Sequence, residues 1–162
     1  MPLKSPNLNL VLIAPEIPQN SGNIGRLCVN TDSRLHLIEP LGFSLQERHV
    51  RRAGLDYWEF LDFRTYSDWK DFLQRELEPN SGASGVYFIS RFGEQTIYDV
   101  SFKDGDYLIF GNESRGLPQH FYQQYKRKLY RIPVLSDKGR SLNLANAVAI
   151  TAYEALRVIN GW

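Results

Sequence analysis

IPVLSDKGRSLNLANAVAITAYEA, residues 132–155, is the stretch that decides the fold. A short apolar run from Tyr130 to Leu135 predicts a strand, and five residues with turn character follow it (residues 136–140). A helical pattern then continues almost to the last residue. This helix is apolar nearly all round, whereas a surface helix shows a single apolar stripe, so we expect it to be buried or to lie in an interface.

Polar side chains occupy the first turn of this predicted helix: Ser141, Asn143 and Asn146. Hydroxyl and amide groups at the start of a helix can accept hydrogen bonds from its free backbone N–H groups, so an N-cap accounts for them. They also lie where a polar loop meets a buried helix, so a functional site accounts for them equally well. The residues alone leave both interpretations open.

The composition is that of an ordinary globular chain. The 162 residues suit one domain, residues 1–162. The net charge of +1 gives no whole-chain signature of nucleic-acid binding, so any such surface must be local. Cys28 is the only cysteine, which excludes an intrachain disulfide, and its spacing from Ile24 and Leu27 predicts a small core residue. No signal peptide or membrane-spanning run is recognisable, so a soluble cytoplasmic protein is expected.

Strand and helix patterns alternate along the whole chain. Strands are predicted at residues 8–14, 34–39, 59–65, 86–90, 107–111 and 130–135. The QNSGNIG stretch (residues 19–25) is predicted to be a loop, and a helix follows it and ends near residue 32. Two further helices are predicted at residues 67–78 and 118–125. Ser67 is expected to cap the helix that it begins, and residues 47–54 form a short basic segment. The alternation predicts an α/β fold, with a mostly parallel sheet and helices on both faces.

Three polar, glycine-bearing loops follow predicted strands, at residues 15–26, 111–118 and 135–143. The carboxyl ends of parallel strands share one edge of a sheet, where ligands bind, so the loops are expected to form one site. The first loop has neither the dinucleotide fingerprint nor a Walker motif. A serine hydrolase is a weak hypothesis without a G-x-S-x-G elbow. No metal site is expected, because the histidines lack ligand spacing: His36, His49 and His120.

Charged side chains in the first two loops have both functional and structural explanations. Arg26 is expected near the start of a helix, where a cation gains nothing from the helix dipole. An anionic partner such as phosphate would explain it, and a solvated surface arginine is the alternative. In the second loop, Gly111 and Gly116 bracket Glu113 and Arg115. The glycines suggest a backbone-lined pocket for a flat ligand, and a tight turn with an incidental ion pair is the alternative.

Basic residues gather in two segments that also contain aromatic residues. Cations interleaved with aromatic rings suit phosphate contacts and base stacking, although a solvated charged face explains either segment equally well. The first segment contains Arg48, His49, Arg51 and Arg52, followed by Tyr57 and Trp58. The second contains Lys126, Arg127, Lys128 and Arg131, flanked by Tyr125 and Tyr130.

Taken together, the three loops carry a family resemblance. PEIPQNSGNIGR (residues 15–26), FGNESRGLP (residues 110–118), and IP (residues 132–133) leading to RSLNLAN (residues 140–146) resemble the three motifs of the SPOUT RNA 2'-O-methyltransferases. RRAGLDY (residues 51–57) and the short length resemble the tRNA (cytidine/uridine) wobble-position 2'-O-ribose methyltransferase subfamily. The similarity covers nearly the whole chain from Leu8 onward.

The resemblance implies several properties that periodicity does not. The carboxyl-terminal part would form a deep trefoil knot that binds S-adenosyl-L-methionine, and the protein would be a homodimer packed through its knotted regions. The substrate would be the anticodon region of tRNA. By position, the cofactor pocket would be lined by Ile89, Gly111, Ile132, Ser141 and Leu142. The catalytic and substrate-binding positions would be Asn20, Arg26, Glu113, Ser141 and Asn143.

The implied reaction transfers the methyl group of the cofactor to a ribose 2'-hydroxyl at the wobble nucleotide. Family proposals make the residue at Arg26 the general base, but arginine keeps its proton under ordinary conditions. A split role is chemically simpler: Arg26 binds the adjacent phosphate, while Asn20, Ser141 and Asn143 orient the hydroxyl. Two rivals are a non-catalytic tRNA-binding protein on the same fold and a dinucleotide-dependent dehydrogenase.

Overall fold

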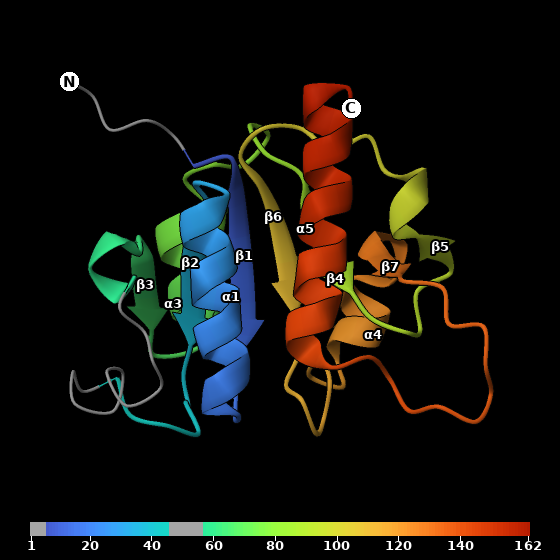
Figure 1. The fold of residues 1–162 in the computed structure, drawn as a ribbon, viewed down its shortest axis with the longest axis horizontal. Coiled ribbons are helices and arrows are strands. Elements are labelled where there is room, and N and C mark those ends of the chain that lie inside the picture. The colour runs from blue at the N-terminus through green and yellow to red at the C-terminus, as the bar shows by residue number, and fades with distance from the viewer. Residues whose placement is uncertain (1–5, 46–56) are drawn as a thin grey trace.

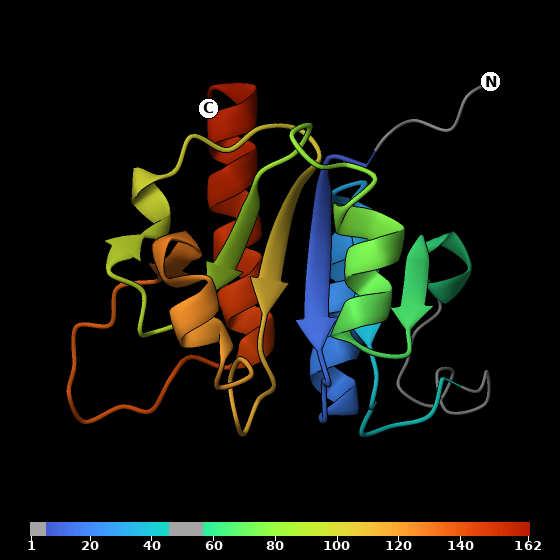
Figure 2. The ribbon, with the colours of Figure 1, turned by 180° about the vertical axis from the view of Figure 1, so that it is seen from behind.

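The structure is a computed structural model, and it describes residues 6–45 and 57–162. A seven-stranded sheet in the order β3-β2-β1-β6-β4-β7-β5 forms its centre, and the neighbouring strands are parallel. Helices α1 and α5 cover one face of the sheet (Figure 1), and α3 and α4 cover the other (Figure 2). The predicted α/β fold with helices on both faces is confirmed.

The strands are β1 Leu8–Ile13, β2 Arg34–Ile38, β3 Phe63–Tyr66, β4 Val86–Ile89, β5 Gln95–Thr96, β6 Asp106–Phe110 and β7 Leu129–Arg131. The α-helices are α1 Pro18–Asn30, α3 Trp69–Phe72, α4 Phe121–Gln124 and α5 Leu144–Asn160. A π-helical segment, η2 Leu73–Leu77, continues α3. Short 3-10 helices lie at η1 Trp58–Phe60, η3 Ile97–Asp99 and η4 Lys126–Lys128.

The central strands are mostly apolar along their length, because both of their faces are covered. All six residues of β1 are buried. Successive side chains of a strand point to opposite faces. Leu10 and Leu12 therefore join the cluster beneath α1 and α5, whereas Val11 and Ile13 join the cluster beneath α3 and α4. Cys28, in α1, is fully buried in the first cluster, which confirms it as a core residue.

Helix α1 begins at Pro18, so the prediction of a loop at residues 19–25 is wrong. Pro18 suits the first helical position, because its φ is fixed there and its missing N–H is not needed. Neither helical glycine has a positive φ. Gly25 instead permits close packing, since a Cβ there would lie 3.2 Å from Cδ2 of Leu61, and the Gly22 carbonyl accepts a hydrogen bond from the Tyr57 hydroxyl.

Other boundaries also differ from those expected. The strand predicted at residues 130–135 is β7, which ends at Arg131; Pro133 has no N–H for a ladder, and Leu135 is 99% exposed. The two-residue strand β5 and η3 were not predicted, because neither has a periodic pattern. Asp68, rather than Ser67, caps α3 by accepting from the backbone N–H of Asp71.

Helix α5 buries only one side in this chain. Val148, Ala152 and Ala155 lie in the core beside α1, whereas Ile150 is 38% exposed and Tyr153 is 49% exposed. Asn143 is the N-cap, and its side-chain oxygen accepts a hydrogen bond from the backbone N–H of Asn146. The capping explanation of the polar first turn is thus correct for Asn143.

A buried polar cluster lies on the α3 side of the sheet, and we call it the Glu76 cluster. Glu76 is 3% exposed and accepts hydrogen bonds from Arg64 Nη1 at 2.5 Å and Tyr107 Oη at 3.1 Å. Oη of Tyr66 lies 2.8 Å from both Glu76 Oε1 and His36 Nδ1. Burial alone would raise the pKa of Glu76, but these partners lower it below its usual range. The cluster also includes Asn9, whose Oδ1 is 2.8 Å from His36 Nε2.

Candidate active site

The three polar loops meet at the carboxyl edge of the sheet, as the sequence predicts. The first follows β1, the second follows β6, and the third leads from β7 into α5. Glu113, in the second loop, accepts hydrogen bonds from the backbone N–H groups of Glu16 at 2.8 Å and Ile17 at 3.1 Å. Nδ2 of Asn112 donates to the Ala14 carbonyl oxygen at 2.5 Å. The second loop therefore holds the first in place and supplies a carboxylate to the start of α1, where a negative charge is favourable.

Three side chains connect all three loops, and we call them the amide relay: Glu113, Asn20 and Asn143. Nδ2 of Asn20 donates to Glu113 Oε1 at 3.3 Å, and Oδ1 of Asn20 accepts from Asn143 Nδ2 at 3.0 Å. Since Asn143 also caps α5 through its Oδ1, both ends of its amide are engaged. The relay fixes the first turn of α5 against α1, and Glu113 positions that pair.

The second loop is a tight turn built on its two glycines. Asn112 and Gly116 exchange backbone hydrogen bonds of 2.9 Å in each direction. A Cβ on Gly111 would lie 2.2 Å from the Gly116 carbonyl carbon, and Gly116 has a φ of +71°. Both glycines are therefore required by the turn itself. The side-chain oxygen of Asn112 accepts from the backbone N–H groups of Ser114 and Arg115, a role that sequence reasoning missed although an Asn three residues before Arg suits such a turn.

A second carboxylate, that of Glu16, ties the same two loops together from the solvent side. The Ser114 hydroxyl donates to Glu16 Oε2 at 2.6 Å. Hydrogen bonds from Ser114 and Asn112, together with the charge of Arg115, lower the pKa of Glu16 below its usual range. Glu16 is therefore a stable anion near neutral pH rather than a base poised to take a proton.

Arg26 and Ser141 are the two predicted catalytic residues that stand apart from the relay. Both are exposed. Arg26 follows Asn20 by six residues, which places it about 9 Å further along the axis of α1 and about 120° around it. Its side chain makes no hydrogen bond or ion pair with the described part of the chain. Its guanidinium is therefore free of partners from residues 6–45 and 57–162 and can bind an anion.

The predicted cofactor-binding residues lie along one part of the same edge. Ile89, at the end of β4, is in register with Phe110 and with Tyr130. Gly111 and Ile132 therefore follow the two strands that flank β4, β6 and β7. Ser141 and Leu142 come from the third loop, and Leu142 is 41% exposed. In that loop the one hydrogen bond recorded between residues 134 and 142 joins the Lys138 N–H to Ser136 Oγ. Free backbone groups beside apolar side chains suit a flat ring with polar edges, so these residues fit an adenine-bearing cofactor.

The predicted RNA-contact residues are placed only in part. Lys126, Arg127 and Lys128 form the exposed helix η4. Arg131 has a structural task, because its Nη1 donates to the carbonyl oxygens of Gly93 at 2.9 Å and Glu94 at 2.5 Å. Arg51 and Arg52 lie outside the described residues, as do Arg48, His49 and the basic segment around them.

The described residues, 6–45 and 57–162, offer neither a metal site nor a membrane-spanning helix. No group of His, Cys, Asp and Glu side chains there could hold a metal ion. No helix in this part of the chain combines the length and apolarity that a bilayer crossing requires.

The amino-acid sequence is similar to those of known RNA methyltransferases. The model of the SpoU rRNA Methylase family matches residues 7–153. A tRNA (cytidine(34)-2'-O)-methyltransferase of Acidovorax sp. (strain JS42) is 45% identical over 150 residues, which cover 92% of this chain and 90% of the relative. The protein of the same name from Escherichia coli (strain K12) is 45% identical over 151 residues, covering 93% of this chain and 92% of the relative.

Solved structures show the same likeness. One that concerns the 2-OH methylation of C/U34 on tRNA has a TM-score of 0.85 and 44% identity, covering 96% of this chain and 97% of the other. The SpoU methyltransferase AviRb from Streptomyces viridochromogenes, in complex with AdoMet, has a TM-score of 0.77 and 22% identity, covering 96% of this chain and 59% of the other. At that identity the second likeness shows a shared fold alone.

Proposed function

This chain belongs to the SpoU rRNA methylase family, and from that premise we propose that it is a tRNA 2'-O-methyltransferase. Its substrate is the ribose of the wobble nucleotide, cytidine or uridine at position 34, which is the activity that the names of its relatives carry. Its methyl donor is S-adenosyl-L-methionine. The amide relay carries the proposal, because it joins the three loops whose motifs resemble those of the family into one site at the edge of the sheet.

The protein's contribution to the reaction is orientation and charge stabilisation. Bound S-adenosyl-L-methionine supplies an electrophilic methyl group, and Ile89, Gly111, Ile132 and the third loop would hold it. Ser141 is exposed just before α5, where its hydroxyl can fix the ribose 2'-hydroxyl for in-line attack, while Asn143, whose amide is engaged by Asn20 and by the cap of α5, holds that turn in place. Glu113 acts through Asn20 and Asn143 rather than on the substrate, since its oxygens are engaged by the start of α1.

Arg26 is assigned to the RNA phosphate beside the reacting ribose. Its exposure and its lack of a partner in the described chain support that role. Arginine is a poor base but a good stabiliser of developing negative charge. Turnover of the Arg26→Lys variant tests the assignment: a simple cation site retains most of its kcat. A drop to background, with S-adenosyl-L-methionine binding unchanged, would instead require the planar guanidinium or its proton chemistry.

Assembly, the knot and localisation are also proposed from the family resemblance. A knot is consistent with a strand order that places β7 between β4 and β5, after which α5 returns beside α1. A homodimer would cover exposed apolar side chains on and beside α5, where Leu142, Ile150 and Tyr153 are 41%, 38% and 49% exposed. Light scattering of the protein and of Tyr153→Asp would test this dimer. We place the protein in the cytoplasm as a single domain.

The decisive test is methylation of bulk tRNA, followed by mass spectrometry of the nucleosides. The expected products are 2'-O-methylcytidine or 2'-O-methyluridine, formed only when S-adenosyl-L-methionine is present. A base-methylated product, or no product, would overturn the assignment. Calorimetry separates the rivals: absence of S-adenosyl-L-methionine binding would favour a non-catalytic RNA-binding protein, and binding of NAD would favour a dehydrogenase.

A further inference from the structure

An exposed aromatic group stands beside the candidate active site, and we call it the Phe92 platform: Arg91, Phe92 and Tyr122. Phe92 is 60% exposed. The guanidinium of Arg91 lies 4.7 Å from the centre of the Phe92 ring, and the Tyr122 ring meets it at 5.6 Å and 87°. A single exposed aromatic residue is ordinary. This ring differs because it packs against Arg91 and Tyr122 and lies beside the candidate active site.

The loop that carries Phe92 is firmly held. The Ser90 N–H donates to the Tyr130 carbonyl at 2.9 Å, and Ser90 Oγ accepts from the Phe92 N–H at 3.2 Å. Gly93 lies so close to the end of β7 that a Cβ there would be 2.7 Å from the Tyr130 carbonyl carbon. Arg131 donates to the Gly93 carbonyl from the other side. The ring is therefore displayed to solvent by a rigid backbone, which lowers the entropic cost of using it for binding.

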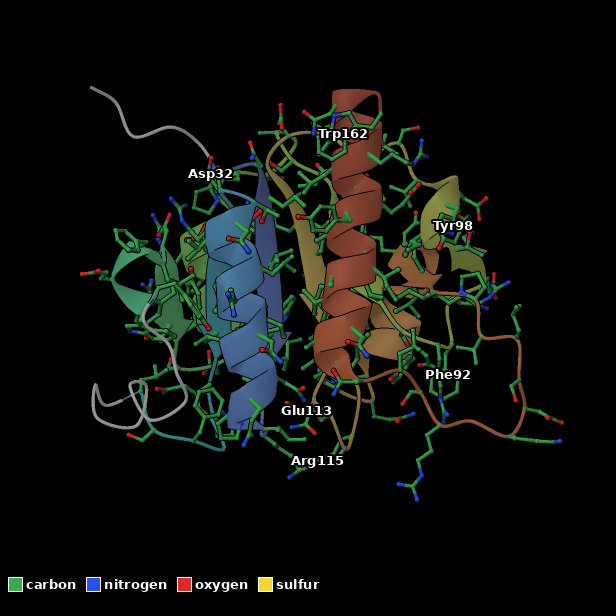
Figure 3. All side chains as sticks on the ribbon, viewed as in Figure 1. Asp32, Phe92, Tyr98, Glu113, Arg115 and Trp162 are labelled. Carbon is green, nitrogen blue, oxygen red and sulfur yellow. The ribbon has the colours of Figure 1, made fainter. Side chains whose placement is uncertain are left out.

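The platform lies next to two parts of the proposed site: the predicted cofactor-binding residues and the turn after β6. Phe92 comes three residues after Ile89, and its loop packs on the residues that precede Ile132. Tyr122 reaches the turn after β6, because its hydroxyl is 3.1 Å from the position of a Cβ on Gly116. Figure 3 shows Phe92 at the same edge of the molecule as Glu113 and Arg115.

We propose that Phe92 stacks on a nucleobase next to the methylated nucleotide, with Arg91 and Arg115 drawing the flanking phosphates. This inference rests on the proposed function, which makes a single-stranded RNA loop the substrate. Unpaired bases bind proteins by stacking on aromatic rings and arginine planes beside cations that track the backbone. Arg91 and Arg115 are both exposed: Arg91 lies over the Phe92 ring, and Arg115 precedes Gly116, which lies close to the Tyr122 hydroxyl. A ring open to solvent suits a base that arrives from outside better than a ring of the cofactor, which would be enclosed.

The test compares variants at Phe92 with an anticodon stem-loop RNA as substrate. Phe92→Ala and Phe92→Leu should raise KM for the RNA about tenfold, within the range measured for loss of one stacked base, while Phe92→Trp keeps the wild-type value. Tyr98→Ala is the control, since Tyr98 is 56% exposed away from this edge and should leave KM unchanged (Figure 3). Removing the stacked base from the RNA should abolish the difference between wild type and Phe92→Ala, and testing each neighbouring nucleotide in turn identifies that base.

Failure of this inference is distinguishable from failure of the proposed function. If wild type methylates the RNA and Phe92→Ala has the same KM, the platform does not bind a base. If Phe92→Ala loses affinity for S-adenosyl-L-methionine in calorimetry while its RNA affinity is unchanged, the ring belongs to the cofactor wall and the proposal is wrong. If wild type itself does not methylate RNA, the proposed function fails first.

Discussion

The Glu76 cluster and the amide relay use similar side chains, but the first is a buried network, whereas the second lies beside exposed polar side chains. In the Glu76 cluster, Arg64, Tyr66 and Tyr107 converge on one buried carboxylate. In the relay, Glu113 and Asn143 are also engaged, yet the adjacent Ser141 and Arg26 are exposed. A closed polar network stabilises a fold, whereas an open one leaves groups for a substrate. The difference indicates which cluster should govern stability and which should govern activity.

The largest effect should come from opening the closed cluster. Glu76→Ala leaves Tyr66 and Tyr107 without their acceptor and should lower the free energy of unfolding by about 3 kcal/mol, as for a broken buried pair. Chemical denaturation near pH 7 measures it. The folded fraction should keep the wild-type KM for tRNA. Loss of activity in fully folded Glu76→Ala would contradict the idea that this cluster governs stability and the relay governs activity.

The matched control is Glu78→Ala, because Glu78 is exposed and its change should stay within about 0.5 kcal/mol of wild type. A pH series sharpens the result with Glu76→Gln. Since the folded-state pKa of Glu76 is lowered, its charge stabilises the fold above the ordinary carboxyl pKa and this contribution is lost as pH falls through the lowered value. The gap between wild type and Glu76→Gln should therefore narrow in acid.

A smaller loss of stability and a clear loss of activity are expected at the relay. Asn143→Ala removes the cap of α5 and the donor to Asn20, so it should cost about 1 kcal/mol of stability and lower kcat/KM at least tenfold. Asn143→Asp keeps a capping oxygen but loses the donor, which separates the two tasks. Full activity in Asn143→Asp would show that only the cap matters. Asn146→Ala is the control, since Asn146 contributes its backbone N–H to the cap.

The smallest effects should come from the cations that the sequence predicts to contact RNA. Neutralising Lys126, Arg127 and Lys128 together, or Arg51 and Arg52 together, should weaken tRNA binding several-fold and flatten its salt dependence by about 0.7 to 0.9 per lost phosphate contact. Fluorescence titrations at several salt concentrations measure both quantities. An unchanged affinity and salt slope in either set would remove that set from the RNA surface.

The sequence predicts where the polar loops meet better than it predicts the bounds of the elements around them. Alternating patterns place three loops at one edge of the sheet, and Glu113, Asn20 and Asn143 do meet there. The start of α1 was missed because its N-cap, Ile17, has no capping side chain; Pro18 was the local signal, and the carboxylate that accepts from the Ile17 N–H belongs to Glu113, 96 residues away. The end of β7 was likewise misplaced, because strand length depends on a partner, and β5 has only two residues.

The strand order could not be read from local patterns either. β6 lies between β1 and β4, and β7 lies between β4 and β5, so pairing is set by long-range packing. The position of Asn143 is ambiguous in the sequence for a related reason: an N-cap and a site residue need the same side chain. The structure shows that Asn143 caps α5 and also contacts Asn20, and the Asn143→Asp variant separates the two interpretations.

The bond between Asn143 and Asn20 joins residues 123 positions apart, so it closes only after nearly the entire chain has been synthesised. The chain emerges from the ribosome amino end first, at about 5–20 residues per second, so α1 and the first two motif loops are exposed before α5 exists. A nascent chain that lacks α5 can have no relay and no complete site. A partly synthesised chain is therefore expected to be inactive, and a truncation before residue 143 should yield a protein without methyltransferase activity.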